Sequence, residues 1–146
     1  IFCLERGSFI SATYFVINTK TKTIHYARAG HCPVLYYSAE TNSSGYLKDK
    51  GKALGMIKNK DYCNHIETNT LSYLPGDIMV LYTDGITEAK DQKGEEFGNE
   101  RLAKILCETT GKNPKEIQDY LIHKLYEYSG TEEINDDYTT MIVKFR

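Results

Sequence analysis

The segment Ile78–Leu81 is the most apolar stretch of the chain, and it follows directly on the turn sequence Leu74–Asp77. A short, continuous apolar run after a proline-glycine turn predicts a strand that is buried on both faces. We expect this strand to continue to Asp84, so that it ends in a carboxylate followed at once by Gly85. An aspartate is an unusual end for a buried strand, which raises the question of what its carboxylate holds.

Four segments before this strand are rich in aromatic, β-branched or alternating residues, which is typical of strands. They are Phe9–Asn18, Ile24–Gly30, Pro33–Ser38 and Asp61–Thr70, with a polar turn at residues 19–23 and a loop at residues 40–45. The first two are expected to form a hairpin.

The hydrophobic period then changes from that of strands to that of helices. Leu102, Ile105 and Leu106 recur at helical spacing after Phe97. A second helix is expected to begin at Pro114, because Asn113 and Glu116 have the spacing of a capping box. Its apolar stripe is expected to dock on the sheet and consists of Ile117, Tyr120, Leu121, Leu125 and Tyr128. A closing strand follows at residues 138–145. This order predicts an α+β fold in which antiparallel pairing dominates.

The length and charge of the chain limit its function. Its 146 residues fit one domain, and a charged content of 26% with a formal net charge of −2 is typical of a soluble globular protein. This balance predicts no nucleic-acid partner and no membrane contact, and no apolar run approaches the roughly 18 residues of a membrane span. Ile1 is not a start methionine, and no signal peptide follows it. The chain is therefore expected to be a piece of a longer one.

The four cysteines are too widely spaced for a zinc site or a disulfide framework. They are Cys3, Cys32, Cys63 and Cys107. We interpret them as packed thiols, which predicts a reducing, cytoplasmic location.

Acidic residues lie at the ends of two predicted strands. Asp84 ends one strand, while Asp136 and Asp137 come directly before the closing strand. If these strands are antiparallel neighbours, the carboxylates converge at one edge of the sheet. Two carboxylates about 4 Å apart repel by roughly 4 kcal/mol at an effective dielectric constant near 20. They would need a shared proton or a cation such as Mg²⁺ or Mn²⁺ between them. Alternatively, Asp84-Gly85 is a common turn and the second pair is a solvated loop or a cap.

Four strings along the chain carry a family resemblance. They are AGHCP (residues 29–33), GKALGM (51–56), LPGDIMVLYTDGITEAKDQKGEEFGNERL (74–102) and NDDYTTMIV (135–143). In this order they resemble the SpoIIE/RsbU-type bacterial serine phosphatases, which belong to the PPM (PP2C-like) metal-dependent protein phosphatases. The resemblance runs from Phe9 to the C-terminus and implies an α-β-β-α sandwich of antiparallel sheets.

The resemblance also implies metal ligands. The aspartate of the TDG string maps to Asp84, and the first aspartate of the DDxT element maps to Asp136. Asp137 is a further candidate, and Gly85 is expected only to let the backbone pass close to the ion. The implied chemistry is hydrolysis of phosphoserine or phosphothreonine by a water that two Mn²⁺ or Mg²⁺ ions activate.

One element of the family has no counterpart here. Its N-terminal D-x-x-G-H-G element supplies an aspartate that bridges both metals, and no such string occurs in this sequence. The resemblance therefore implies that residues 1–146 are the C-terminal portion of a single phosphatase domain, whose N-terminal strands and helices are missing. We expect the isolated chain to be nearly inactive, to bind metal weakly if at all, and to self-associate through a bared sheet edge or face.

His31 stands where eukaryotic relatives carry an aspartate near the metals. It can act as an acid for the leaving oxygen, or it can simply form a hydrogen bond within the turn.

Several functions remain open from the sequence. The first is a phosphatase acting on a phosphorylated regulatory protein, such as an anti-sigma-factor antagonist in bacterial signalling, under an upstream sensor domain. The second is a non-catalytic phosphatase-like module that binds a regulatory partner. A calcium-stabilised β protein would fit the carboxylates but not the four strings.

Overall fold

The computed structural model describes residues 7–47, 49–57, 61–131 and 136–146. The chain divides into two compact units. The first unit consists of residues 1–33 and 48–73, and the second of residues 34–47 and 74–146. Cys3 and Asn135 lie outside the described residues.

The first unit contains an antiparallel sheet of three strands in the order β1-β2-β5. The strands are β1 (Ala12–Asn18), β2 (Thr23–Ala29) and β5 (Thr68–Ser72), and a 3₁₀-helix, η1 (Tyr62–His65), precedes β5. β1 and β2 form the predicted hairpin, in which Ala12 pairs with Ala29 and Asn18 with Thr23.

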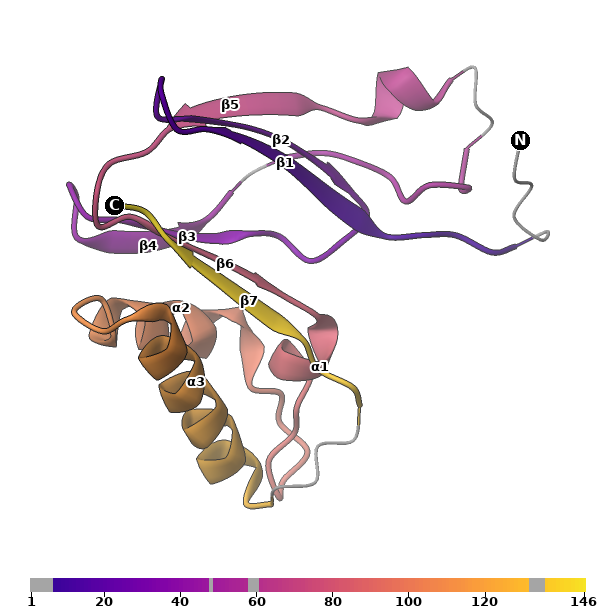
Figure 1. The fold of residues 1–146 in the computed structure, drawn as a ribbon. Coiled ribbons are helices and arrows are strands. Elements are labelled where there is room, and N and C mark those ends of the chain that lie inside the picture. The colour runs from indigo at the N-terminus through magenta and orange to yellow at the C-terminus, as the bar shows by residue number, and fades with distance from the viewer. Residues whose placement is uncertain (1–6, 48, 58–60, 132–135) are drawn as a thin grey trace. The chain divides into compact units, whose positions relative to one another are not determined.

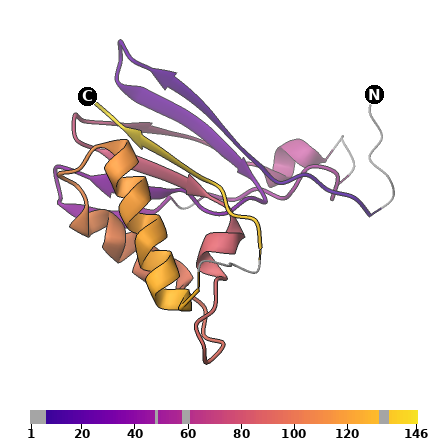
Figure 2. The ribbon, with the colours of Figure 1, turned by 60° about the horizontal axis from the view of Figure 1, so that its bottom comes forward.

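The second unit contains an antiparallel sheet of four strands in the order β4-β3-β6-β7. The strands are β3 (Leu35–Ser38), β4 (Ser43–Tyr46), β6 (Ile78–Tyr82) and β7 (Thr140–Lys144). The helices of this unit are α1 (Asp84–Thr87), α2 (Gly98–Glu108) and α3 (Pro114–Ser129). α2 contacts β3 and β4 while α3 contacts β7, so both helices cover one face of this sheet (Figures 1 and 2).

β6 is the central strand that the apolar run predicts. It pairs with β3 on one side and with β7 on the other, both antiparallel. Ile78, Met79 and Val80 are each at most 2% exposed, which confirms the prediction for this strand.

The start of α3 confirms the predicted capping box. The Asn113 side chain accepts a hydrogen bond from the Glu116 amide at 3.0 Å, and the Glu116 carboxylate accepts one from the Asn113 amide at 2.8 Å. Ile117, Leu121 and Leu125 of the predicted stripe are buried. α3 therefore docks through the face that its periodicity predicts.

Several local predictions are wrong. The segment expected to be a loop contains β4, which is a polar edge strand. The predicted strand at residues 61–70 begins with η1 and becomes extended only at Thr68. Strand β6 ends at Tyr82, so Asp84 begins helix α1 instead of ending the strand. Cys63 and Cys107 are exposed and are not packed thiols. None of the helices in the described ranges is both long and apolar enough to cross a membrane.

The second unit is expected to lose stability at alkaline pH because of Tyr46. Burial raises the pKa of its hydroxyl from 10.0 to about 12. The folded state thus favours the neutral hydroxyl, and this stabilisation is complete below pH 10 and is lost as the pH rises through about 12. Urea midpoints measured from pH 8 to pH 12 should fall above pH 10, and Tyr46→Phe should make that fall smaller. A Tyr46→Phe chain with an unchanged alkaline profile would contradict this assignment.

Candidate functional site

Asp84 lies at the first position of α1, two residues after β6 ends. Thr83 between them is extended, with φ −97° and ψ 159°. The side chain of Asp84 is exposed, and its carboxylate accepts no hydrogen bond and forms no ion pair within the described part of the chain. A carboxylate without a described protein partner at the start of α1 is available to an external cation.

The segment that leads into β7 lies against this position. The Thr83 amide donates a hydrogen bond to the Thr139 carbonyl at 3.1 Å, and the Thr139 amide donates one to Thr83 Oγ1 at 2.9 Å. These bonds extend the β6–β7 pairing to the point where the aspartates occur. The predicted antiparallel neighbourhood of the two strands is therefore confirmed.

Gly85 is required by this close approach. A Cβ on Gly85 would lie 2.6 Å from the carbonyl oxygen of Asp137, closer than real Cβ contacts. The glycine thus admits the backbone of the second acidic segment. Asp136 and Asp137 are both exposed, and Asp136 Oδ1 accepts a hydrogen bond from the Asp137 amide at 2.8 Å.

The donor chemistry of this sheet edge fits a hard divalent cation. Asp84, Asp136 and Asp137 offer exposed carboxylate oxygens, the ligands that Mg²⁺ and Mn²⁺ prefer, and no described lysine or arginine forms an ion pair with them. No group of three or more His, Cys, Asp or Glu side chains with metal-binding geometry occurs among the described residues. These carboxylates therefore suit part of a ligand set, to which further oxygen ligands must be added.

His31 lies in the first unit, directly after β2. Its Nδ1 and the Ser11 hydroxyl oxygen are 3.2 Å apart and share a hydrogen bond. Its carbonyl oxygen accepts a hydrogen bond from Arg28 Nη1 at 2.7 Å.

Arg28 and Asp49 form a buried ion pair that the sequence does not reveal. Arg28 Nε donates to Asp49 Oδ1 at 2.7 Å, and Arg28 Nη2 donates to the Asp49 carbonyl at 2.7 Å. The Asp49 side chain is fully buried. Burial raises the pKa of the Tyr26 hydroxyl, and the negative charge of Asp49 adds to this shift. A single arginine between two apolar strand residues gives no sign of its partner, which lies on a loop 21 positions away.

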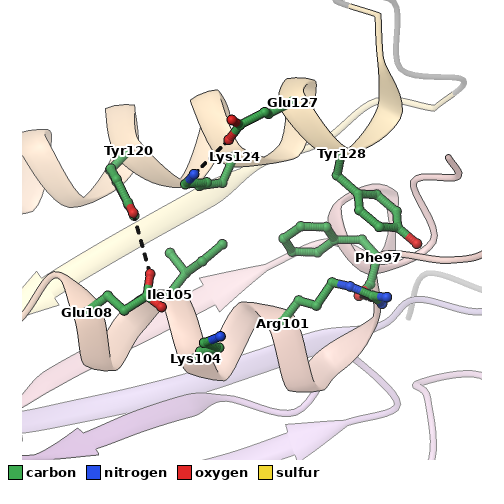
Figure 3. Close-up of a pocket in the computed structure, with 9 residues that line it drawn as sticks. All are labelled: Phe97, Arg101, Lys104, Ile105, Glu108, Tyr120, Lys124, Glu127 and Tyr128. Atoms are coloured by element: carbon green, nitrogen blue, oxygen red, sulfur yellow. Dashed lines mark hydrogen bonds and ion pairs between the residues drawn. The ribbon is translucent and has the colours of Figure 1, made fainter.

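A groove of about 430 Å³ lies between α2 and α3 in the second unit (Figure 3). The Arg101 guanidinium lies 4.7 Å from the centre of the Tyr128 ring, and its Nη1 donates to the Phe97 carbonyl at 2.9 Å. Lys124 pairs with Glu127 at 2.7 Å, whereas neither Arg101 nor Lys104 forms an ion pair with a described residue.

The comparisons with known proteins point to one family. The family model described as stage II sporulation protein E (SpoIIE) matches residues 3–146. The chain is 30% identical over 147 residues to the phosphoserine phosphatase RsbU of Bacillus subtilis (strain 168). That alignment covers 97% of this chain and 40% of RsbU, so the chain spans less than half the length of this curated relative.

Two solved structures show the same fold. The SiaA-PP2C domain of Pseudomonas aeruginosa gives a TM-score of 0.77 at 22% identity, over 93% of this chain and 52% of that one. The manganese-presoaked phosphatase domain of SpoIIE from Bacillus subtilis gives 0.65 at 17% identity, over 92% of this chain and 56% of that one. The α+β arrangement of antiparallel sheets and helices is thus that of PP2C phosphatase domains.

Proposed function

Because the chain belongs to the SpoIIE family, we propose that it is part of a metal-dependent phosphatase that hydrolyses phosphoserine or phosphothreonine on a regulatory protein. The observation that carries this proposal is the contact between residues 83–85 and 137–139. It holds the chain just after Asp136 against the chain around Asp84, and both aspartates are exposed, which supports a shared site.

Asp84 and Asp136 are the proposed metal ligands, with Asp137 as a further candidate. When bound, Mn²⁺ or Mg²⁺ would supply the positive charge that polarises the phosphoryl group and lowers the pKa of the attacking water. The exposed carboxylates would attract the cation, and the pairing of β6 with β7 supports their lying at one end of the two strands. The bridging aspartate of the family is proposed to come from the part of the domain that precedes this chain.

His31 is the proposed acid for the leaving oxygen. As the water oxygen bonds to phosphorus, the bond from phosphorus to the seryl oxygen breaks and its electron pair stays on that oxygen. His31 gives its proton to the seryl oxygen, which leaves a serine hydroxyl and inorganic phosphate. The imidazole then takes up a proton from solvent.

The proposal is tested with the complete gene product that contains this chain. Hydrolysis of a phosphoserine peptide should require added Mn²⁺ or Mg²⁺ and should stop in excess chelator. The isolated 146-residue chain should be nearly inactive under the same conditions. Full turnover in chelator would contradict the metal proposal, and full turnover by the isolated chain would contradict the proposed need for the preceding part.

The proposed setting is bacterial signalling in the cytoplasm. An anti-sigma-factor antagonist is the proposed phosphoprotein substrate, and an upstream sensor domain is proposed to control the activity. A relative of this chain, RsbU, is named a phosphoserine phosphatase, which supports the substrate class.

The α2–α3 groove favours a second candidate, a non-catalytic module that binds a regulatory partner. Arg101 and Lys104 lie one helical turn apart, and like charges at that spacing repel mildly. Next to them the half-buried rings of Tyr120 and Tyr128 line the groove, above the buried side chains of Phe97 and Ile105. Cations without a described counter-charge beside apolar surface suit an acidic, amphipathic segment of a protein partner.

Charge reversal tests this second candidate. A Glu/Leu amphipathic peptide is expected to shift amide NMR signals of residues 97–108 and 120–128, and Arg101→Glu with Lys104→Glu should weaken its binding about tenfold or more. Lys93→Glu with Lys115→Glu changes the net charge equally outside the groove and should have little effect. If both double substitutions weaken peptide binding equally, the attraction is non-specific and this candidate is overturned.

We also propose that the isolated chain self-associates. β1 is an edge strand, and its side chains Tyr14 and Val16 are 68% and 44% exposed. An exposed, apolar edge strand pairs readily with another chain. Sedimentation at micromolar concentration should show a dimer or larger species, and Val16→Lys should shift the equilibrium towards the monomer. A monomer at all concentrations would refute self-association.

A further inference from the structure

We infer that Arg28, held in place by Asp49, is a positioning residue that fixes His31 for its role as the acid. This inference rests on the proposed function for its catalytic part. Its geometric part concerns the first unit alone and has a separate readout.

Arg28 directs its three side-chain nitrogens to three separate oxygens. Nη1 donates to the carbonyl of His31, Nε to the carboxylate of Asp49 and Nη2 to the carbonyl of Asp49, each at 2.7 Å. One guanidinium thus ties the turn after β2 to the loop at residues 49–53. The planar fork of arginine suits this task, because lysine has a single nitrogen and cannot reach all three acceptors at these separations.

Burial makes this ion pair costly to disturb. The side chain of Asp49 is 0% exposed and that of Arg28 is 20% exposed. Asp49 Oδ2 is also buried and has no hydrogen-bond partner among the described residues. A buried carboxylate with one oxygen unsatisfied depends on its arginine, since removing one partner leaves an uncompensated charge. The pair therefore holds the turn and the loop in one geometry.

Two glycines bring the turn and the loop into contact. Gly30 has φ +67°, and its amide donates to the Gly51 carbonyl at 2.8 Å. A Cβ on Gly30 would lie 2.7 Å from the Cβ of Ala53, and a Cβ on Gly51 would overlap the carbonyl oxygen of Arg28. The strings around residues 29–33 and 51–56 are therefore two halves of one packed element.

The His31 side chain is oriented at the same place. Its Nδ1 shares a hydrogen bond with Ser11, while no described residue bonds its Nε2. With the carbonyl held by Arg28 and the ring held by Ser11, Nε2 is the ring nitrogen that has no described partner and can give a proton to a substrate. Arg28 acts on the reaction only through this histidine.

The experiment compares two substrates of the complete gene product. Serine is a poor leaving group that needs a proton, whereas p-nitrophenolate leaves without one. His31→Ala is expected to lower kcat for a phosphoserine peptide by about 100-fold and to change p-nitrophenyl phosphate hydrolysis little. Arg28→Lys should show the same selectivity with a smaller loss, about tenfold, and Arg146→Lys should change neither substrate. If Arg28→Lys lowers both substrates equally, the residue has only a structural role and the inference fails.

A second measurement needs no activity and uses the 146-residue chain. Arg28→Lys is expected to speed hydrogen exchange of the Gly30 and His31 amides at least about tenfold and to move the ¹⁵N signals of the His31 ring. Arg146→Lys should leave both unchanged. If the unsubstituted complete gene product hydrolyses neither substrate, the proposed function fails. The amide exchange rates and the His31 ring signals still test whether Arg28 positions His31. Unchanged exchange and unchanged ring signals in the Arg28→Lys chain would overturn the positioning role.

Discussion

Replacing Asp84 by asparagine in the complete gene product is expected to remove most of the proposed metal-dependent phosphatase activity and to leave the fold intact. Asparagine keeps the shape of the side chain but loses the charge that attracts the cation. Because charge stabilisation by a bound metal is worth several kcal/mol, we expect kcat/KM to fall by about 100-fold or more. Activity on a phosphoserine peptide, measured against Mn²⁺ concentration, checks this expectation.

Asp119→Asn provides the matched control for this substitution. Asp119 is an exposed aspartate of α3 whose carboxylate already pairs with Lys115 at 2.6 Å. The exchange makes the same chemical change and should leave activity and metal dependence unaltered. If Asp84→Asn retains parental turnover at limiting Mn²⁺, Asp84 is not a metal ligand.

Replacing Asp77 by alanine is expected to lower the free energy of unfolding more than any other substitution proposed for this chain. The side chain of this buried residue accepts hydrogen bonds from the Tyr36 hydroxyl at 2.6 Å, the Ala39 amide at 2.7 Å and the Leu74 amide at 2.8 Å. Alanine would leave all three donors without their acceptor. Because hydrogen bonds to a charged group contribute about 1.5–3 kcal/mol each and are not additive, we expect the free energy of unfolding to fall by about 3–5 kcal/mol.

Urea unfolding of the 146-residue chain measures this loss. Asp77→Asn keeps acceptor capacity at one position and should lie between the parent and Asp77→Ala. Asp119→Ala removes an exposed carboxylate and should stay within about 0.5 kcal/mol of the parent. An Asp77→Ala chain as stable as Asp119→Ala would show that the three hydrogen bonds contribute nothing net.

The parts of the fold that sequence predicts well are those determined by near neighbours. The capping box at Asn113 and Glu116 needs only three residues of spacing, and the apolar run of β6 shows its burial directly. β4 was missed because Ser43 to Gly45 carry little strand propensity, and they become a strand by pairing with β3. The predicted strand at residues 61–70 failed at its start, because alternation alone does not distinguish η1 from an extended segment.

The candidate site was predictable where a residue type reveals its chemistry. Asp84 and Asp136 stand out as acidic residues beside apolar strands, and the pairing of β6 with β7 confirms that these two strands are antiparallel neighbours. The residues that hold these features in place were not predictable. Asp77 bonds Tyr36 from 41 positions away, and Arg28 bonds Asp49 from 21 positions away. Such partners are determined by tertiary packing, and local sequence patterns do not reveal them.

The pairing of β6 with β7 also determines when the acidic site can exist. β7 is made after both long helices, and its end is fastened to the start of β6 by hydrogen bonds between Phe145 and the residues Gly76 and Asp77. A nascent chain on the ribosome can therefore complete α2 and α3 before residues 137–139 pack against Thr83 and Gly85. The edge proposed to bind metal is completed only once β7 has left the exit tunnel, so it is among the last parts of the second unit to form.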